Sequence, residues 1–454
     1  MYNINPSIDY KTKELIINKQ RIILLYNDIL VNKEMINKEI LSKIKDLSKK
    51  QIQDLNKYLP NINTEKIKKK DINNKLNNSN LILIINNNIY SIETKLITDR
   101  AISPSTNELN ITGPKDSFNE NINTNINLIR KRIKSKNLIL KESIIGKETN
   151  TKISLLYMNN IANDKLVNEI QNKLNNINID GIIDSSYIKK YLDTNKLFPT
   201  IIQTERPDKA SIALLEGKCI ILVENSPYAL ILPSFLLDFF HTPDDYYQKN
   251  INTTFIRLIR LCAFLISLLT PAIYIATTTR NYNLLPYKLL IMLKAGRTFV
   301  PFPAYIEAFF MIVCFEILKE TDIRMSQTSS SAVSILGGLI LGDAAVSAGI
   351  VSPIMIIVIA ISSISGLIFS SLELSNALRT YKILLLILSS ILGIYGVLIG
   401  LIYLIINLIN TKTFNYKYLS PIYPFNKNEI KDSFIKLKNT KRNSYLTNNI
   451  NRGE

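Results

Sequence analysis

The sequence predicts an α/β N-terminal region made of two related subdomains, followed by a polytopic bundle of transmembrane α-helices. Two observations support this division of the 454 residues. Residues 259–409 contain nine Lys or Arg and six Asp or Glu, and their apolar runs approach the roughly 20 residues that cross a bilayer. Residues 1–258 instead mix charged and apolar side chains with the periodicities of strands and helices.

The distribution of charge predicts which side of a membrane the ends occupy. Lys plus Arg outnumber Asp plus Glu by 37 to 28 in residues 1–258 and by 9 to 3 in residues 410–454. Basic segments favour the cytoplasmic side, so we expect the N-terminal region and a basic tail, 410–454, in the cytoplasm. The first 30 residues mix Lys, Asn and Asp through every window, and we expect no export signal there.

The N-terminal region contains an internal similarity. Residues 22–44 and 153–174 each have a short apolar run ending Leu-Leu-Tyr, a polar turn and an amphipathic stretch. Residues 81–92 and 219–230 each place a turn rich in Asn or Ser between two runs of β-forming residues, and they align without gaps. We predict two related α/β subdomains, 1–96 and 150–258. Chance similarity in a sequence rich in Ile and Asn is the alternative.

Between them, a connector at 97–149 contains one predicted amphipathic helix, Asp116 to Lys134. Its C-terminal end carries Arg130, Lys131 and Arg132, whose charges suit the helix dipole. This cluster is a candidate contact for another subunit or for anionic lipid, and a solvated face is the alternative. We expect no nucleic-acid binding, because no recognition motif accompanies the cluster.

The membrane region, 259–409, is predicted to contain five or six segments. Ile259 to Thr278 is the first span, with Pro271 expected to kink it. Leu284 to Val300 is apolar but carries Lys288, Lys294 and Arg297, and is an interfacial, re-entrant or spanning segment. Two cytoplasmic ends require an even number of spans, which favours counting it as the sixth. Ile383 to Ile409 is predicted to be one long span that tilts or projects.

Acidic residues in membrane helices are costly, and they mark ion paths or polar contacts between helices. Glu307 is a candidate for either role. Glu316 and Glu320 share a face near the end of the predicted helix, where we expect interfacial ion pairs. Glu320 lies four residues before Arg324, a favourable order for a salt bridge.

A stretch of small residues contains the other candidate pore or gating residues. Gly338 and Gly342 have the spacing that lets helix backbones approach closely. Asp343 and Ser347 follow, and a carboxylate there must face protein, water or a pore. If copies assemble around an axis, a ring of Asp343 and Ser347 would attract cations. Close packing around a hydrogen-bonded Asp343 is the alternative.

Catalysis finds little support in the sequence, and we predict no catalytic residues, metal site or cofactor. The single histidine, His241, has no nucleophile or metal-ligand spacing around it. No phosphate-binding or dinucleotide-binding pattern is present. The acidic pair Asp244 and Asp245 precedes the first span, and we expect it to link the N-terminal region to the membrane helices.

Several long segments, in order, carry a resemblance to a known family. They are TGPKDSFNENINTNINLIRKRI (112–133), TERPDKASIALLEGKCIILVENSPYALILP (204–233), DDYY (244–247), VPFPAYIEAFFM (300–311), GGLILGDAAVSAGIVSP (337–353) and TFNYKYLSPIYPF (413–425). Together they resemble the GerA family of bacterial spore germination proteins, the A-type subunits of nutrient germinant receptors.

The resemblance implies a receptor subunit in the spore inner membrane. It implies a transporter-like B subunit that binds nutrient and a C-subunit lipoprotein as partners. It also implies that A subunits oligomerise into a ligand-gated, cation-conducting channel. A non-conducting sensor or scaffold subunit, which relays the signal to a separate channel, is the alternative.

Overall fold

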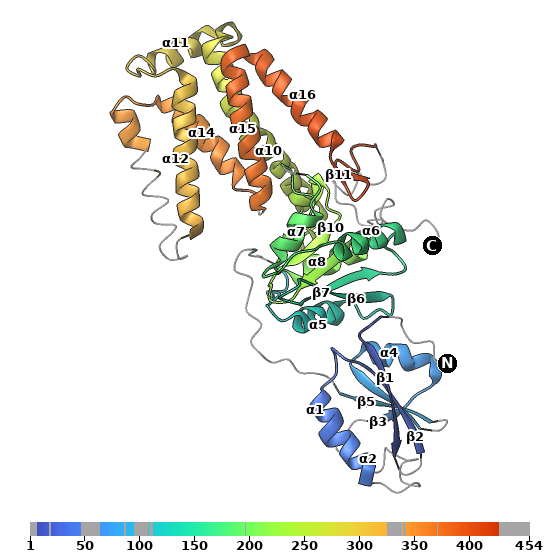
Figure 1. Ribbon diagram of the computed structural model, residues 1–454. Helices are drawn as coiled ribbons and strands as arrows, with labels where there is room; N and C mark the ends of the chain where they lie inside the picture. The colour runs from blue at the N-terminus through green and yellow to red at the C-terminus, as the bar shows by residue number, and fades with distance from the viewer. Residues whose placement is uncertain are drawn as a thin grey trace.

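Two antiparallel sheets and a set of long helices follow one another along the chain (Figure 1). The computed structural model describes residues 7–17, 20–46, 64–85, 88–94, 108, 112–195, 197–324, 338, 342–369 and 371–425.

The first sheet has the strand order β1-β2-β4-β5-β3. The Ile- and Leu-rich sequence of β4 is almost wholly buried, whereas β1, which contains Lys11, Lys13 and Glu14, is an exposed edge. Its strands are β1 (Tyr10–Ile17), β2 (Gln20–Asn27), β3 (Thr64–Lys66), β4 (Asn80–Ile85) and β5 (Asn88–Glu93). Together with its helices this sheet forms the first α/β unit.

The second sheet has the equivalent order, β6-β7-β9-β10-β8. Its strands are β6 (Leu138–Ile145), β7 (Thr151–Met158), β8 (Ile202–Thr204), β9 (Cys219–Val223) and β10 (Ala229–Leu232). The two segments predicted as hairpins are β4 with β5 and β9 with β10, and they occupy equivalent places in the two sheets. The internal similarity therefore corresponds to two units of one topology.

One boundary differs from the sequence prediction. Residues 138–149 were assigned to the connector, but β6 pairs with β7 over eight residues and is an edge strand of the second sheet. The predicted amphipathic helix is also part of this second α/β unit, as α5 (Ile122–Arg132), because its buried Ile126 and Ile129 pack against the sheet. The signal for the boundary was weak because β6 contains Lys141 and Glu142 in an otherwise apolar run.

Helices cover both faces of each sheet. In the first unit, residues 33–46, which include α1 (Lys33–Met35) and α2 (Ser42–Asp46), pack on one face, and α4 (Ile72–Asn77) packs on the other. In the second unit, α6 (Asp164–Asn175) and α7 (Ser185–Leu192) lie on one face, whereas α5 and α8 (Pro207–Leu215) lie on the other. Asn121 and Asn163 cap α5 and α6, so part of the Asn-rich composition begins helices.

The helical region starts inside the interval assigned to the second subdomain. Helix α10 runs continuously from Asn250 to Thr279 with Pro271 inside it, rather than starting at residue 259. Among the described residues, α10 and α15 are long and apolar enough to cross a membrane. The helices that follow α10 are α11 (Tyr287–Ala295), α12 (Ala304–Arg324), α14 (Pro353–Gly366), α15 (Leu372–Leu392) and α16 (Ile394–Asn410).

Two predictions for this region are wrong. Helix α11 has nine residues, or about 14 Å, and is too short for a hydrocarbon core of about 30 Å, so Leu284 to Val300 is not a sixth span. The run Ile383 to Ile409 is not one span, because it divides at Gly393 into α15 and α16. Gly393 has φ +63°, and the side-chain oxygen of Asn281 accepts a hydrogen bond from Ile394 N at 2.9 Å.

After α16 the chain returns to the second α/β unit (Figure 1). A two-stranded hairpin, β11 (Lys412–Thr413) and β12 (Tyr416–Lys417), lies there. The amide of Leu236 donates to the carbonyl of Tyr418 at 3.1 Å, and Thr413 Oγ1 donates to the carbonyl of Thr200 at 3.3 Å. Both ends of the helical region are therefore attached to one α/β unit.

Candidate functional site

Three of the sequence segments that carry the resemblance meet where the second α/β unit joins α10. Arg206 binds Asp208 in a bidentate pair, with Nε to Oδ1 at 3.0 Å and Nη2 to Oδ2 at 2.6 Å. The hydroxyl of Tyr247 donates to the same Asp208 Oδ2 at 2.9 Å. Tyr247 belongs to α9 (Asp244–Tyr247), so its hydrogen bond to Asp208 connects α8 to the segment that precedes α10.

The segment that begins at Thr112 closes this cluster. The backbone N and the Oγ1 of Thr112 both donate to Asp244 Oδ1, at 3.1 and 3.0 Å. Arg206 Nη2 donates to the carbonyl of Pro114 at 3.2 Å. Gly113 has φ +108°, and a Cβ there would lie 2.6 Å from the Tyr247 ring. Glycine is required at this position by both the backbone and the neighbouring ring.

Burial and charge shift the pKa values of this cluster. Burial opposes ionisation of Asp208, but the bonds from Arg206 and Tyr247 outweigh it and hold the Asp208 pKa below its ordinary value. Burial, together with the adjacent Asp208 carboxylate, raises the pKa of Tyr247 to about 12. At neutral pH the cluster is therefore a carboxylate held by a guanidinium and a neutral phenol.

Asp245 connects this cluster to α10. Its carboxylate binds Arg260 Nη1 at 2.9 and 3.0 Å and Arg257 Nε at 3.3 Å, and Asp245 is 2% exposed. Burial opposes its ionisation, but Arg260 and Arg257 hold the Asp245 pKa below its ordinary value. This contact is the link between the N-terminal region and the helices that the sequence predicts for the Asp244 and Asp245 pair.

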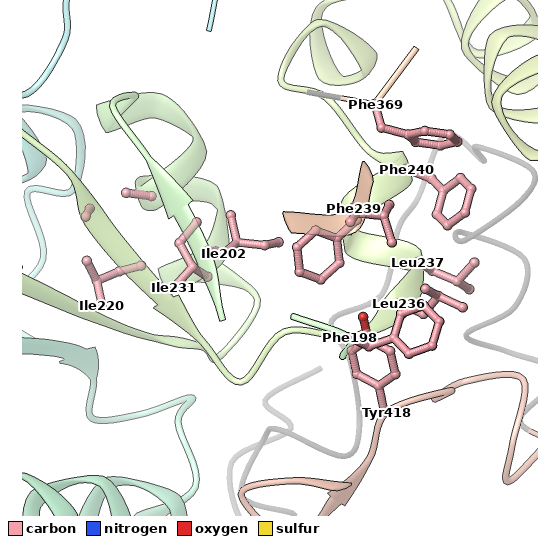
Figure 2. Packing of buried hydrophobic residues seen from close by; sticks show 14 of the residues in the cluster. Phe198, Ile202, Ile220, Ile231, Leu236, Leu237, Phe239, Phe240, Phe369 and Tyr418 are labelled. Atoms are coloured by element: carbon pink, nitrogen blue, oxygen red, sulfur yellow. The ribbon is translucent and has the colours of Figure 1, made fainter. Parts of the chain in front are cut away.

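Aromatic side chains form the apolar part of the same junction (Figure 2). Phe240, from a short 3₁₀ helix at Leu236–Phe240, makes edge-to-face contacts with Phe264 of α10 and with Phe369, both at 5.4 Å between ring centroids. Phe198 stacks on Tyr381 of α15 at 5.3 Å and lies 6.2 Å from the ring of Tyr418.

A salt bridge makes a further contact between the second α/β unit and α15. Lys189 Nζ of α7 lies 2.5 Å from Glu373 Oε2 in the first turn of α15. Sequence reasoning did not find this pair, because 184 positions separate its members and no local pattern relates them.

Glu307, predicted as a pore or contact residue, is 1% exposed and fully bonded. Its Oε1 lies 2.8 Å from Arg297 Nη2, and its Oε2 accepts from Ser352 N at 3.1 Å. It therefore joins α12 to the turn after α11 and to the N-terminus of α14. The predicted ion pairs of Glu316 and Glu320 are present, with Arg379 at 3.2 Å and Arg324 at 2.7 Å.

In the described part of the small-residue stretch, the two glycines have few close neighbours. A Cβ added to Gly338 would meet nothing within 4 Å, and one added to Gly342 would meet only Ile356 Cγ2, at 3.9 Å. Within the described chain, these glycines do not serve the close helix contact that their spacing predicts. Asp343 and Ser347, in the helical residues 342–347, are both exposed.

The three basic residues of α5 do not form one face. Arg130 is 3% exposed and its Nη2 lies 2.6 Å from Asp9 Oδ2 of the first α/β unit, so its prediction as a surface contact is wrong. Arg132 Nη2 binds Asp116 at 2.5 and 2.6 Å. Lys131 alone of the three is exposed.

A cavity lies between the described helices, and we call it the helical cavity. It has a volume of about 410 Å³ and lies between α10, α12, α14 and α15. Its charged lining residues are Glu316, Lys319, Asp322, Arg379 and Lys382. Lys382 is 8% exposed.

Comparison with known proteins gives one consistent family. A model of the GerA family, described as Bacillus/Clostridium GerA spore germination protein, matches residues 2–445. Spore germination protein KA of Bacillus subtilis (strain 168) is 38% identical over 340 residues, which make up 74% of this chain and 62% of that protein. Spore germination protein GerQA of Bacillus cereus is 32% identical over 443 residues, or 96% of this chain and 89% of that protein.

A solved structure has a similar sequence over about half of this chain. The crystal structure of the N-terminal domain of the A subunit of the Bacillus megaterium spore germinant receptor GerK3 is 30% identical, with a TM-score of 0.38. The match covers 51% of this chain and 90% of that one. The family model, which spans nearly the whole sequence, shows that this chain belongs to the GerA family of spore germination proteins.

Proposed function

We propose that this chain is the A subunit of a nutrient germinant receptor. In this proposal, copies of the chain assemble in the spore inner membrane, and their helical regions surround a ligand-gated cation channel. Membership of the GerA family supports the role in germination. A transporter-like B subunit that binds nutrient and a C-subunit lipoprotein are the proposed partners.

The exposure of Asp343 and Ser347, next to the open space beside Gly342, is the observation that carries the channel proposal. Asp343 is exposed on a helical segment between α12 and α14, in the least charged part of the sequence. A carboxylate that faced lipid there would be costly, so a neighbouring copy or a water-filled path must cover it. A ring of such carboxylates attracts cations.

The attachment of both helical ends to one α/β unit supports a particular topology. Helix α10 leaves the second α/β unit, and the segment after α16 returns to it (Figure 1). The helical region then crosses the membrane an even number of times. The basic charge of residues 1–258 and 410–454 favours the cytoplasm for both ends.

Replacement of Asp343 tests the channel. The receptor complex, purified with its B and C subunits, would be reconstituted into liposomes that contain a potassium-sensitive dye. We expect Asp343→Asn to reduce nutrient-triggered cation flux about tenfold, because a ring loses its charge, while the assembly keeps its size on a sizing column. Glu320→Gln is the matched control, since Glu320 is 59% exposed and pairs with Arg324 along α12.

The same experiment separates the channel from a scaffold. A scaffold that relays the signal elsewhere would leave the liposomes sealed to cations when nutrient is added. Unchanged flux in an intact Asp343→Asn complex would remove Asp343 from the conduction path.

A further inference from the structure

Lys382 is a buried cation that forms no ion pair with the described residues, although the carboxylate of Glu316 attracts its charge. Its side chain lines the helical cavity, is 8% exposed, and makes no hydrogen bond or ion pair with the described residues. Its neighbours are engaged elsewhere, because Glu316 pairs with Arg379 at 3.2 Å and Lys319 donates to Ser375 Oγ at 2.6 Å. An ammonium removed from water needs a close partner, and the described residues supply none at ion-pair distance.

The remainder of the cavity wall is suited to an apolar group. Phe315, Leu318 and Leu378 line it, together with Ile364 and Leu367 near the end of α14. Ile364 and Leu367 are also 64% and 62% exposed, so the cavity reaches the outer surface of the helices. An acyl chain could enter there from a surrounding bilayer.

We propose that the helical cavity binds an amphipathic anion, with one carboxylate or phosphate group on Lys382 and an apolar tail directed past Ile364 and Leu367. The lining carries three positive and two negative side chains, so a single negative charge balances it, whereas a cationic ligand adds to the positive excess. A volume of about 410 Å³ lies within the range of small-molecule sites. The exposed apolar rim favours a membrane lipid over a free organic anion as the source.

The test is the thermal unfolding of the full chain in detergent micelles, with lipids or salts added. We expect phosphatidylglycerol to raise the Tm and phosphatidylcholine, which has no net charge, to leave it unchanged. Lys382→Met should weaken the apparent affinity about 30-fold or more, because it leaves the anion without its buried partner. Lys382→Arg should retain most of the binding.

Lys288→Met is the matched control, because Lys288 is exposed on α11 and outside the cavity. It should leave the response to phosphatidylglycerol unchanged. Butyrate and inorganic phosphate distinguish the two sources of anion. A response to these salts that depends on Lys382 would identify a free anion, and a response to phosphatidylglycerol alone would identify a lipid.

Three results would overturn the proposal. The first is an equal response of the parent chain and Lys382→Met to phosphatidylglycerol. The second is an equal response of the parent chain to both lipids. The third is a lower Tm of Lys382→Met without added ligand, since removal of a buried charge that forms no ion pair should leave the Tm equal or higher. The proposal requires membrane insertion of the helices but not ion conduction, so the flux experiment tests the channel separately.

Discussion

Single buried carboxylates hold the second α/β unit to the helices. Asp208 and Asp245 each bind Arg side chains inside the protein, and each has a pKa below its ordinary value. Sequence reasoning found the acidic pair before α10 but not the Arg206 and Asp208 partnership. Arg206 and Asp208 are only two positions apart, and a local pattern of charges does not reveal that both are buried.

We expect Asp208→Asn to lower the free energy of unfolding by about 3–5 kcal/mol at neutral pH, because Arg206 would remain buried without its partner. The pKa of Asp208 is lower in the folded chain than its value of about 3.9 in the unfolded chain, so ionised Asp208 stabilises the fold at pH values above about 3.9. This stabilisation is lost as the pH falls from there towards the folded pKa. Unfolding of the full chain in detergent, followed by circular dichroism from pH 7 to about pH 3, measures both effects.

Asp180→Asn is the control for this variant, since Asp180 is exposed. Its stability should follow that of the parent chain at every pH. If the difference in free energy of unfolding between the parent chain and Asp208→Asn stays constant down to the lowest pH, the assigned pairing of Asp208 is contradicted.

At the scale of elements, the sequence predicts segments with strong local patterns. The β4/β5 and β9/β10 hairpins, the apolar face of α5 and the Glu320–Arg324 pair are all confirmed, because each depends on residues close in the chain. The division between α15 and α16 was missed. Hydropathy stays high through Gly393, and the turn depends on a φ of +63° and on Asn281, which lies 113 positions away.

Gly393→Ala should prevent this turn. A Cβ would lie 2.1 Å from Asn281 Oδ1, in a conformation that side chains rarely adopt, and we expect a loss of at least about 1–3 kcal/mol. Thermal unfolding in detergent measures it. Gly296→Ala is the matched control, because a Cβ there would make only ordinary contacts, none closer than 3.5 Å. Equal stability of the two variants would mean that α15 continues into α16.

At the scale of the whole molecule, the second α/β unit contacts α10, α15 and the segment after α16. Burial of Arg130 against Asp9 adds a contact to the first α/β unit. Apart from the Asp245 link to α10, these long-range contacts could not be predicted from the sequence, because their partners are distant in the chain and each side chain is ordinary in its local setting. The candidate pore residues stay predictions, since a single copy leaves Asp343 and Ser347 uncovered.

The Lys189–Glu373 pair offers a test of communication between the α/β region and the helices. Glu373 is 45% exposed, so we expect the pair to contribute only about 0.5–1 kcal/mol to stability. Lys189→Glu should nevertheless slow nutrient-triggered flux, because it places two carboxylates together at the start of α15. Adding Glu373→Lys should restore the rate. Equal flux from the parent, single and double variants would exclude this contact from signalling.

The return of residues 411–418 to the second α/β unit has a consequence for biosynthesis. Phe198 and Leu236 are synthesised before the helical region, α10 to α16. Tyr418, which contacts both, is synthesised after the six described helices of that region. A ribosome that stops before residue 411 would release a protein whose α/β unit has an uncovered apolar surface, which quality-control proteases and chaperones recognise. Residues 411–418 can therefore cover this surface only after α16 has been synthesised and its C-terminal end lies on the same side of the membrane as the second α/β unit.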